Sequence, residues 1–271
     1  MEFHCLVASE RSRFQPGIVA IEQSATYPLG DDFFQIDHGS NYFAFFDRLG
    51  EVKYHLAMDG DTVAAVGAGV LRQISYYQGE APRPAWYLCD LKVHPNYQRQ
   101  RLSLRLLRQV IPLQALRCAQ GYAISMNSHP SLNFNRSSNP LVRVLEKFSP
   151  IKFRSVTTLG IYSLDEDQMR YLEPLLVEHR GLLSYLSLRG KKDLRLQSNG
   201  KILLLLHVQW GMTARLEVTT PRSGYIHMFC APTDDRLAIA LAHHGVTPQA
   251  TASVISVGMD SDWLFILTSD I

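Results

Sequence analysis

One aspartate of this 271-residue chain lies inside an apolar run, where its carboxylate could take part in a reaction. Asp90 stands in Ala85–Val93, a segment apolar and aromatic enough to form a central strand of a sheet. A carboxylate in such a place can accept the proton that an amine loses when it attacks a carbonyl carbon. The alternative is a structural role, in which backbone donors or an arginine hold the aspartate in its strand.

A polar and basic segment follows this strand. His94-Pro95 ends the strand, and the leucines at positions 102, 106 and 107 share one face of a helix predicted from Asn96 onward. We expect Pro112 to kink or end this helix. The free N–H groups and positive dipole at a helix N-terminus favour a phosphate group. The alternative is an ordinary strand, turn and amphipathic helix with a solvated basic face.

The segment Asp90–Leu107 resembles the acyl-CoA signature of the GNAT superfamily of N-acyltransferases. That signature is a strand ending in V-x-P, followed by [QR]-x-x-G-x-[GA] at the start of a helix. The present sequence departs from it, because Arg101 and Ser103 stand where the family has glycine and glycine or alanine. Glycine allows close backbone approach to phosphate, whereas arginine offers a charge-assisted contact instead. The resemblance extends over Phe33–Leu164.

The resemblance implies an acyl-CoA donor, acetyl-CoA or another, and a set of residues that contact it. These residues are Leu91, Val93, Gln98, Arg99, Gln100, Arg101, Leu102, Ser103, Leu104 and Asn139. Asp90 fits the Y-x-x-D-L-x-V arrangement of aminoglycoside-type acetyltransferases in the same superfamily. The resemblance therefore implies that Asp90 is the general base.

Two more residues are candidates for catalysis. The segment Asn139–Phe148 resembles the family helix N-P-x-A-x-x-L-Y-E, and it has Glu146 where that helix has the tyrosine that protonates the leaving thiolate. A glutamate could replace this acid only if burial raised its pKa, and the alternative is a surface residue. His129, with Asn127 and Ser128, follows a predicted strand and is placed to line the acceptor site; the alternative for His129 is a solvated turn.

The elements around these residues predict an α/β fold with a mixed sheet. A short helix over Ser40–Gly50 precedes a hairpin whose turn is Asp59-Gly60-Asp61. After the central strand and helix come a strand from Tyr122, a helix from Asn139 and a strand over 155–164. We assign no function to residues 1–30, which show little periodicity. Strict alternation along the central strand would place Cys89 on the face opposite Asp90.

The pattern of elements restarts at Asp165. We expect a helical segment over 165–190, a hairpin over Asn199-Gly200, and then strand, helix, strand and strand, the last over 262–270. This order suggests a GNAT-like domain at 1–164, followed by a smaller C-terminal α/β domain at 165–271 that is a degenerate GNAT-like repeat. We expect it to shape the acceptor side without a second signature loop.

The composition excludes several classes of protein and site. The net charge of +2 does not indicate a nucleic-acid partner, and no apolar run is long enough to cross a bilayer, so we expect a cytoplasmic protein with no membrane association. The four cysteines include no CxxC pair, which argues against a zinc ribbon or a disulfide scaffold. No metal site is predicted, and the oligomeric state stays open.

The sequence therefore predicts an acyltransferase that moves an acetyl or other acyl group from acyl-CoA to the amine of a small molecule. One alternative takes the acyl group from an acidic acyl-carrier protein, which Arg101, Arg105 and Arg108 on one helix face would contact. The other alternative is a non-catalytic binding or scaffold protein that keeps the GNAT fold.

Overall fold

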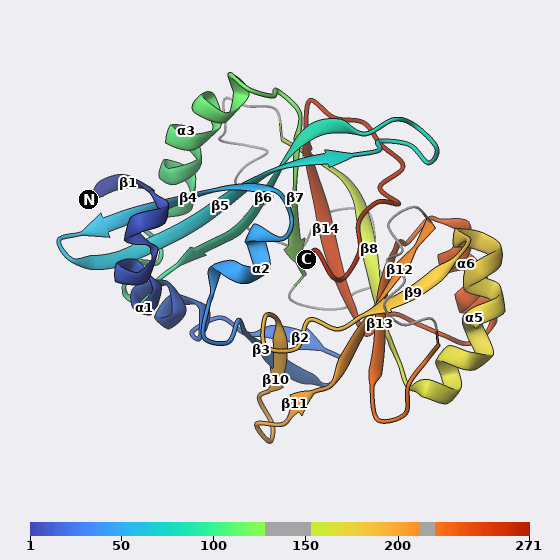
Figure 1. The fold of residues 1–271 in the computed structure, drawn as a ribbon. Helices are drawn as coiled ribbons and strands as arrows, with labels where there is room; N and C mark the ends of the chain where they lie inside the picture. The colour runs from blue at the N-terminus through green and yellow to red at the C-terminus, as the bar shows by residue number, and fades with distance from the viewer. Residues whose placement is uncertain (128–152, 212–219) are drawn as a thin grey trace.

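The computed structural model describes residues 1–127, 153–211 and 220–271 (Figure 1). The elements of the first part are β1 (Glu2–Leu6), α1 (Arg11–Glu22), β2 (Tyr27–Leu29), β3 (Asp32–Asp37), α2 (Phe43–Asp47), β4 (Glu51–Asp59), β5 (Thr62–Ile74), β6 (Arg83–Val93), α3 (Leu102–Ala115), β7 (Gly121–Met126) and β8 (Arg154–Leu164). Those that follow are α5 (Glu166–Arg180), β9 (Leu183–Leu186), β10 (Asp193–Leu196), β11 (Ile202–Leu203), β12 (Leu205–Trp210), β13 (Ile226–Pro232), α6 (Arg236–His243) and β14 (Ala250–Val257).

Two sheets organise the described residues. The larger has ten strands in the order β1-β4-β5-β6-β7-β14-β8-β13-β12-β9, and the smaller has the order β11-β10-β3-β2. In the larger sheet β6 pairs with β7, and β12 with β13, in parallel, while the other pairs are antiparallel. The predicted mixed α/β sheet is confirmed.

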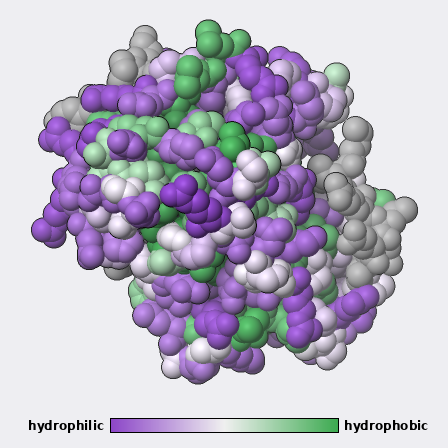
Figure 2. All heavy atoms as spheres, turned by 60° about the vertical axis from the view of Figure 1, so that its left-hand side comes forward, coloured by the Kyte–Doolittle hydropathy of each residue, from purple (hydrophilic) through white to green (hydrophobic). Residues whose placement is uncertain are grey.

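The helices cover both faces of the larger sheet (Figure 1). Neighbouring residues of a strand point to opposite faces. Leu56 of β4 accordingly packs in one core cluster with α1 and α2, whereas Ala57 packs in another with Leu102 and Leu106 of α3. Helices α5 and α6 cover the strands of the C-terminal half in a third cluster. The face shown in Figure 2 is mostly hydrophilic, with apolar patches between the polar residues.

The last strand of the chain lies in the middle of the larger sheet. β14 pairs with β7 on one side and with β8 on the other, so it joins strands from both halves of the chain. Asn127 helps to hold this junction: its amide nitrogen donates to Thr251 Oγ1 at 3.0 Å, and its amide oxygen accepts from Ser253 Oγ at 2.9 Å. The sheet is therefore continuous across the predicted domain boundary at residue 164.

The predicted elements that depend on local turn or cap signals are confirmed. β4 and β5 form the hairpin over Asp59-Gly60-Asp61, β10 and β11 pair around Asn199-Gly200, and α2 lies in the segment predicted as a short helix. The helix after the central strand begins at Leu102, and Pro112 lies inside it without ending it. The predicted helix from Asn139 lies outside the described residues.

Residues 1–30, whose weak periodicity predicts no element, form β1, α1 and β2. Two other predictions are wrong. The helix predicted over 165–190 ends at Arg180, where Gly181 takes a positive φ of 78°, and Leu183–Leu186 then forms a strand because it can pair with β12. Residues 262–270 form turns, and their buried side chains, such as Trp263 and Leu267, pack into the core without pairing as a strand.

None of the helices in the described part of the chain has both the length and the apolar character that crossing a bilayer requires.

Candidate active site

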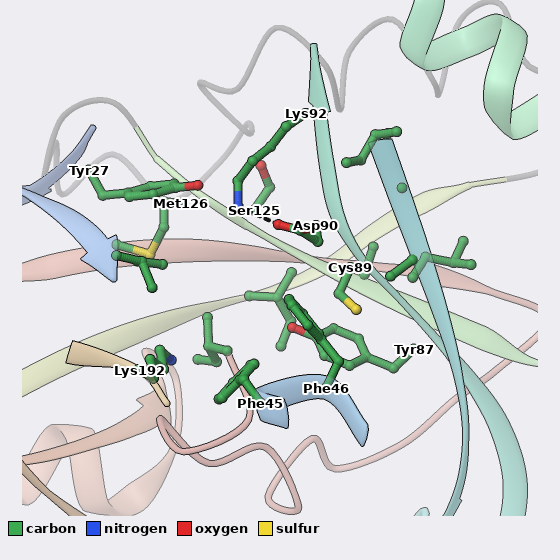
Figure 3. A pocket seen from close by; sticks show the side chains of 18 of the residues that line it. Tyr27, Phe45, Phe46, Tyr87, Cys89, Asp90, Lys92, Ser125, Met126 and Lys192 are labelled. Atoms are coloured by element: carbon green, nitrogen blue, oxygen red, sulfur yellow. Dashed lines mark hydrogen bonds and ion pairs between the residues drawn. The ribbon is translucent and has the colours of Figure 1, made fainter. Parts of the chain in front are cut away.

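The two parallel strands β6 and β7 separate part of the way along their length. They pair only where Trp86–Leu88 lies beside Gly121–Ala123, although both strands continue beyond this point. A cavity of about 250 Å³ occupies the region where they diverge and reaches both faces of the sheet. Figure 3 shows Cys89, Asp90 and Lys92 from β6 and Ser125 and Met126 from β7 around this space.

Glycines on β5 bring α3 close to the sheet at one side of the cavity. A Cβ atom added at Gly69 would lie 2.1 Å from Nε2 of Gln114, and one added at Gly67 would lie 2.9 Å from Cδ2 of Leu106. Gln114 and Leu106 both line the cavity. The absence of a side chain at Gly67 and Gly69 therefore sets the position of this wall.

Asp90 sits at a break in the regular pleat of β6. Its φ is 54°, a left-handed conformation that aspartate tolerates better than most residues, and the register between β5 and β6 shifts at this point. Because of this bulge the alternation of side chains fails. Asp90 accepts from Lys92, which also pairs with Glu22 at the end of α1. Cys89 belongs to the core cluster that contains residues of α1, so both side chains lie on the α1 side of the sheet. The prediction that the two residues face opposite sides is therefore wrong.

The carboxylate of Asp90 belongs to a buried ionic cluster. The ammonium group of Lys92 donates both to Oδ1 of Asp90 and to Oε2 of Glu22, the last residue of α1. The side chains of Glu22 and Asp90 are almost fully buried. Among the described residues, no group donates to Oε1 of Glu22 or to Oδ2 of Asp90, and Glu22 acts on Asp90 as a side-chain hydrogen-bond partner. Asp90 and Lys92 line the cavity, so a hydrogen-bond donor of a bound molecule can reach this cluster.

Burial and charge together set the protonation of this cluster. Burial raises the pKa of Asp90 to about 7; the Lys92 ammonium opposes this rise, and the neighbouring Glu22 carboxylate adds to it. The pKa of Lys92 is held well above its ordinary value by the carboxylates and by Tyr27, against the effect of burial. Asp90 can therefore exchange a proton near neutral pH, which a general base requires. The adjacent thiol differs, because burial raises the pKa of Cys89 to about 12.

The segment between β6 and α3 has the backbone path of a tight turn. Arg99 and Arg101 take positive φ values of 65° and 56°, and Arg101 makes no side-chain cap on the helix. Arg101 therefore occupies, at an energetic cost, a conformation that glycine adopts freely. Both arginine side chains are exposed. The start of α3 is thus open to a charged group.

The structure brings only some of the predicted site residues together. Asp90 and Leu91 line the cavity, and Val93 ends β6. Gln98, Arg99, Gln100, Arg101, Leu102, Ser103 and Leu104 surround the start of α3 and are not among the cavity-lining residues. The side chains of Leu102 and Leu104 are buried, so only their backbone can face a ligand. His129, Asn139 and Glu146 lie outside the described residues.

Two residues of the ionic cluster were not predicted. Lys92 was present in the signature segment but was not considered as a partner of Asp90. Glu22 lies in a region where the sequence predicts neither a helix nor a function, because Pro16 and scattered charges obscure the periodicity of α1. A carboxylate at the end of an apolar helical turn, Ile18–Glu22, is the signal that would have identified it.

Comparisons with known proteins agree with this geometry. Residues 20–139 match the model of the acetyltransferase (GNAT) family. An uncharacterized protein of Acanthamoeba polyphaga mimivirus is 23% identical over 238 residues, which cover 86% of this chain and 68% of that protein.

Solved structures are similar at lower identity. A tandem GNAT protein from the clavulanic acid biosynthesis pathway, solved without AcCoA, is 12% identical with a TM-score of 0.54, and the match covers 94% of this chain and 97% of that chain. NAA60 of Arabidopsis thaliana, in complex with acetyl-CoA, is 16% identical with a TM-score of 0.39, over 59% of this chain and 87% of that chain. Residues 20–139 are therefore similar to the acetyltransferase (GNAT) family, and the chain has the fold of a tandem GNAT protein.

Proposed function

We propose that this protein is an N-acyltransferase that moves an acetyl or other acyl group from acyl-CoA to the amine of a small molecule. The observation that carries the proposal is the carboxylate of Asp90, which is buried, lines the cavity between β6 and β7, and has one oxygen to which no group of the described residues donates. The GNAT-family match of residues 20–139 supports the choice of reaction.

The donor would lie along β6 and the start of α3. The hydrogen-bonded pairing of β6 with β7 ends at Leu88. Backbone groups of later β6 residues, such as Leu91 and Val93, are therefore available on that side for hydrogen bonds with the extended part of acyl-CoA. The N–H groups in the first turn of α3 and the exposed Arg99 and Arg101 suit the phosphates of coenzyme A. These features fit acyl-CoA as the source of the activated acyl group.

Asp90 would act on the acceptor. The amine loses a proton to the free oxygen of Asp90 as its nitrogen forms a bond to the acyl carbon, and the carbon–sulfur bond then breaks to release the thiolate. Lys92 holds the Asp90 carboxylate in place, and Glu22 raises the pKa of Asp90. Asn139 as a coenzyme A contact, His129 at the acceptor and Glu146 as the acid remain part of the proposal. A cytoplasmic location also remains a prediction.

Acetyl-CoA binding and turnover test this function. We expect acetyl-CoA to raise the melting temperature, because a ligand that binds only the folded state stabilises it. Release of the coenzyme A thiol in the presence of a panel of amines then measures transfer. No melting shift with coenzyme A or any acyl thioester would support the scaffold alternative. A shift with acyl-carrier protein alone would support the carrier-protein alternative.

A further inference from the structure

A second buried cation lines the same cavity, away from Asp90. Lys192 lies between β9 and β10 and is only 7% exposed. Its ammonium group donates to the backbone oxygen of Thr268 at 3.1 Å and lies 5.1 Å from the ring centre of Phe45. Among the described residues, no carboxylate forms an ion pair with Lys192. A buried ammonium ion with one neutral acceptor and an aromatic face lacks the counter-ion that such groups normally have.

The carboxylate whose charge acts on Lys192, that of Asp270, already has arginine partners. Asp270 accepts from Arg72 at 2.8 Å and lies 3.5 Å from Arg48. Burial and the charge of Arg48 lower the pKa of Lys192, and the charge of Asp270 raises it by less. The net result is a pKa of about 7. This end of the cavity therefore favours an anion.

A histidine beside Lys192 offers a further contact. His207 is 1% exposed and lines the cavity, with Nδ1 at 3.0 Å from Oγ1 of Thr268. Because that hydroxyl donates its own hydrogen to the backbone oxygen of Met228 at 2.9 Å, Nδ1 must carry the proton toward it. Nε2 is then a buried acceptor that has no partner within the part of the chain that the structure describes. It can accept a hydrogen bond from a ligand.

The two polar ends of the cavity have opposite charge. At one end Asp90 and Glu22 share the single cation of Lys92, which leaves an excess of negative charge when both carboxylates are ionised. At the other end no carboxylate of residues 1–127, 153–211 or 220–271 forms an ion pair with Lys192. Figure 3 shows Lys192 and Phe45 apart from Asp90 and Lys92, and apolar residues such as Phe34, Ile36 and Met228 also line the cavity.

We infer that the acceptor is an amine that also carries a carboxylate at the far end of an apolar body. Its carboxylate binds Lys192, and its amine lies at Asp90. This inference rests on the proposed function, because it takes the Asp90 end as the place of transfer. The negative end attracts the protonated amine and the positive end attracts the carboxylate, so the cavity selects both the class of molecule and its direction.

Calorimetric titration with three simple probes tests the carboxylate site. The probes are hexanoate, n-hexylamine and 6-aminohexanoate, which carry the carboxylate, the amine and both groups. We expect the two carboxylates to bind the wild-type protein, and Lys192→Met to weaken both by roughly tenfold or more while n-hexylamine binding stays unchanged. Lys191→Met, at the neighbouring exposed lysine, is the matched control and should leave carboxylate affinity intact. Failure of hexanoate to bind, or equal affinity in wild type and Lys192→Met, would overturn the inference.

The pH dependence of hexanoate binding to the wild-type protein is an independent measurement that needs no variant to fold. The titratable and charged groups that act on Lys192 or are acted on by it are Arg48, Asp270, Cys230, Lys92, His207 and His38. Burial lowers the pKa of both histidines, that of His38 to about 4, so both are neutral above pH 6. Affinity should fall by about tenfold per pH unit above 7, as Lys192 loses its proton. Asp90 ionises in the same range, so Lys192→Met provides the baseline. A wild-type profile that matches this baseline would contradict the role of Lys192.

Succinyl-CoA separates the acceptor from the donor as the source of the carboxylate. If the acceptor supplies the carboxylate, Lys192→Met should have the same small effect on the melting-temperature shift with acetyl-CoA as on the shift with succinyl-CoA. A selective loss of the succinyl-CoA shift would place the carboxylate on the acyl group and overturn the assignment to the acceptor. Absence of any acetyl-CoA shift would instead contradict the proposed function, while the hexanoate titration, which needs no coenzyme A, would still decide the Lys192 site.

Discussion

One lysine between two buried carboxylates determines the chemistry available at the residue scale. Lys92 neutralises one negative charge, so Asp90 and Glu22 compete for it, and burial raises the pKa of Asp90 to about 7. The same contacts have a structural consequence. Removing either carboxylate leaves an ion pair, whereas removing Lys92 leaves two carboxylates without a cation. Catalysis and stability can therefore be tested separately.

Asp90→Asn should lower turnover by about 10²–10⁴-fold with little change in melting temperature, because Glu22 still pairs with Lys92. In the wild-type protein the rate should rise as the pH increases through about 7, since only ionised Asp90 accepts a proton. The charged and titratable groups facing Asp90 are Glu22, Lys92 and Tyr27. Glu22→Gln is the matched control: it should keep turnover and move the midpoint of the pH profile downward, because a like charge is lost. Normal turnover by folded Asp90→Asn would show that Asp90 is structural.

Lys92→Met should reduce the free energy of unfolding by about 3–5 kcal/mol, the cost of leaving buried charges unpaired. In this variant the pKa of the buried Asp90 carboxylate is higher in the folded than in the unfolded state. The folded state is therefore favoured when Asp90 is protonated, and this contribution is lost as the pH rises through the folded pKa of Asp90. Urea unfolding at pH 5 and pH 8 should show a larger deficit at pH 8. Lys53→Met, at an exposed lysine of β4, should change stability by no more than about 0.5 kcal/mol. Equal deficits at both pH values would argue against unpaired charge as the cause.

At the scale of elements, the turn into α3 combines a glycine-like backbone with arginine side chains. Arg99 and Arg101 keep positive φ values although neither is glycine. The conformation is strained for both residues. We interpret the arginines as a compensation, because an exposed guanidinium can bind phosphate where close backbone contact is reduced.

Arg101→Gly should increase the free energy of unfolding by about 1 kcal/mol, because glycine relieves the left-handed strain while losing some entropy on folding. The same change should weaken acetyl-CoA binding if the guanidinium contacts phosphate. Gln109→Gly, at an exposed position inside α3, provides the comparison and should reduce stability by about 1 kcal/mol. Chemical unfolding measures both variants. Destabilisation by Arg101→Gly would mean that the arginine side chain makes contacts worth more than the strain.

At the scale of the whole molecule, the halves of the chain complete one another. β14, near the end of the sequence, fills the position between β7 and β8, and Asp270 accepts from Arg72 of β5. The proposed ends of the acceptor site also come from different halves, since Asp90 is on β6 and Lys192 precedes β10. This arrangement bears on the predicted division at residue 164.

A fragment of residues 1–164 should therefore fail to fold by itself, because β7 and β8 would lose the strand that pairs with both. We expect aggregation or a non-cooperative thermal transition by circular dichroism. Co-expression with residues 165–271 should restore a soluble complex that unfolds cooperatively. A cooperative transition of the 1–164 fragment alone would instead support two independent domains with the predicted boundary.

The sequence by itself determined the features whose causes are local. The turns at Asp59-Gly60-Asp61 and Asn199-Gly200 carry their own conformational preference, and the strand and helix around Asp90–Leu107 follow from periodicity and the GNAT signature. Only the tertiary structure decided the partner of Asp90, the place of β14 and the burial of Lys192 with no ion pair to a described carboxylate. The ionic contact between Glu22 and Lys92, like the approach of Lys192 to Thr268, joins positions about seventy residues apart. Such contacts form because packing buries those groups together, and neither turn preference nor hydrophobic period records which distant residues will meet.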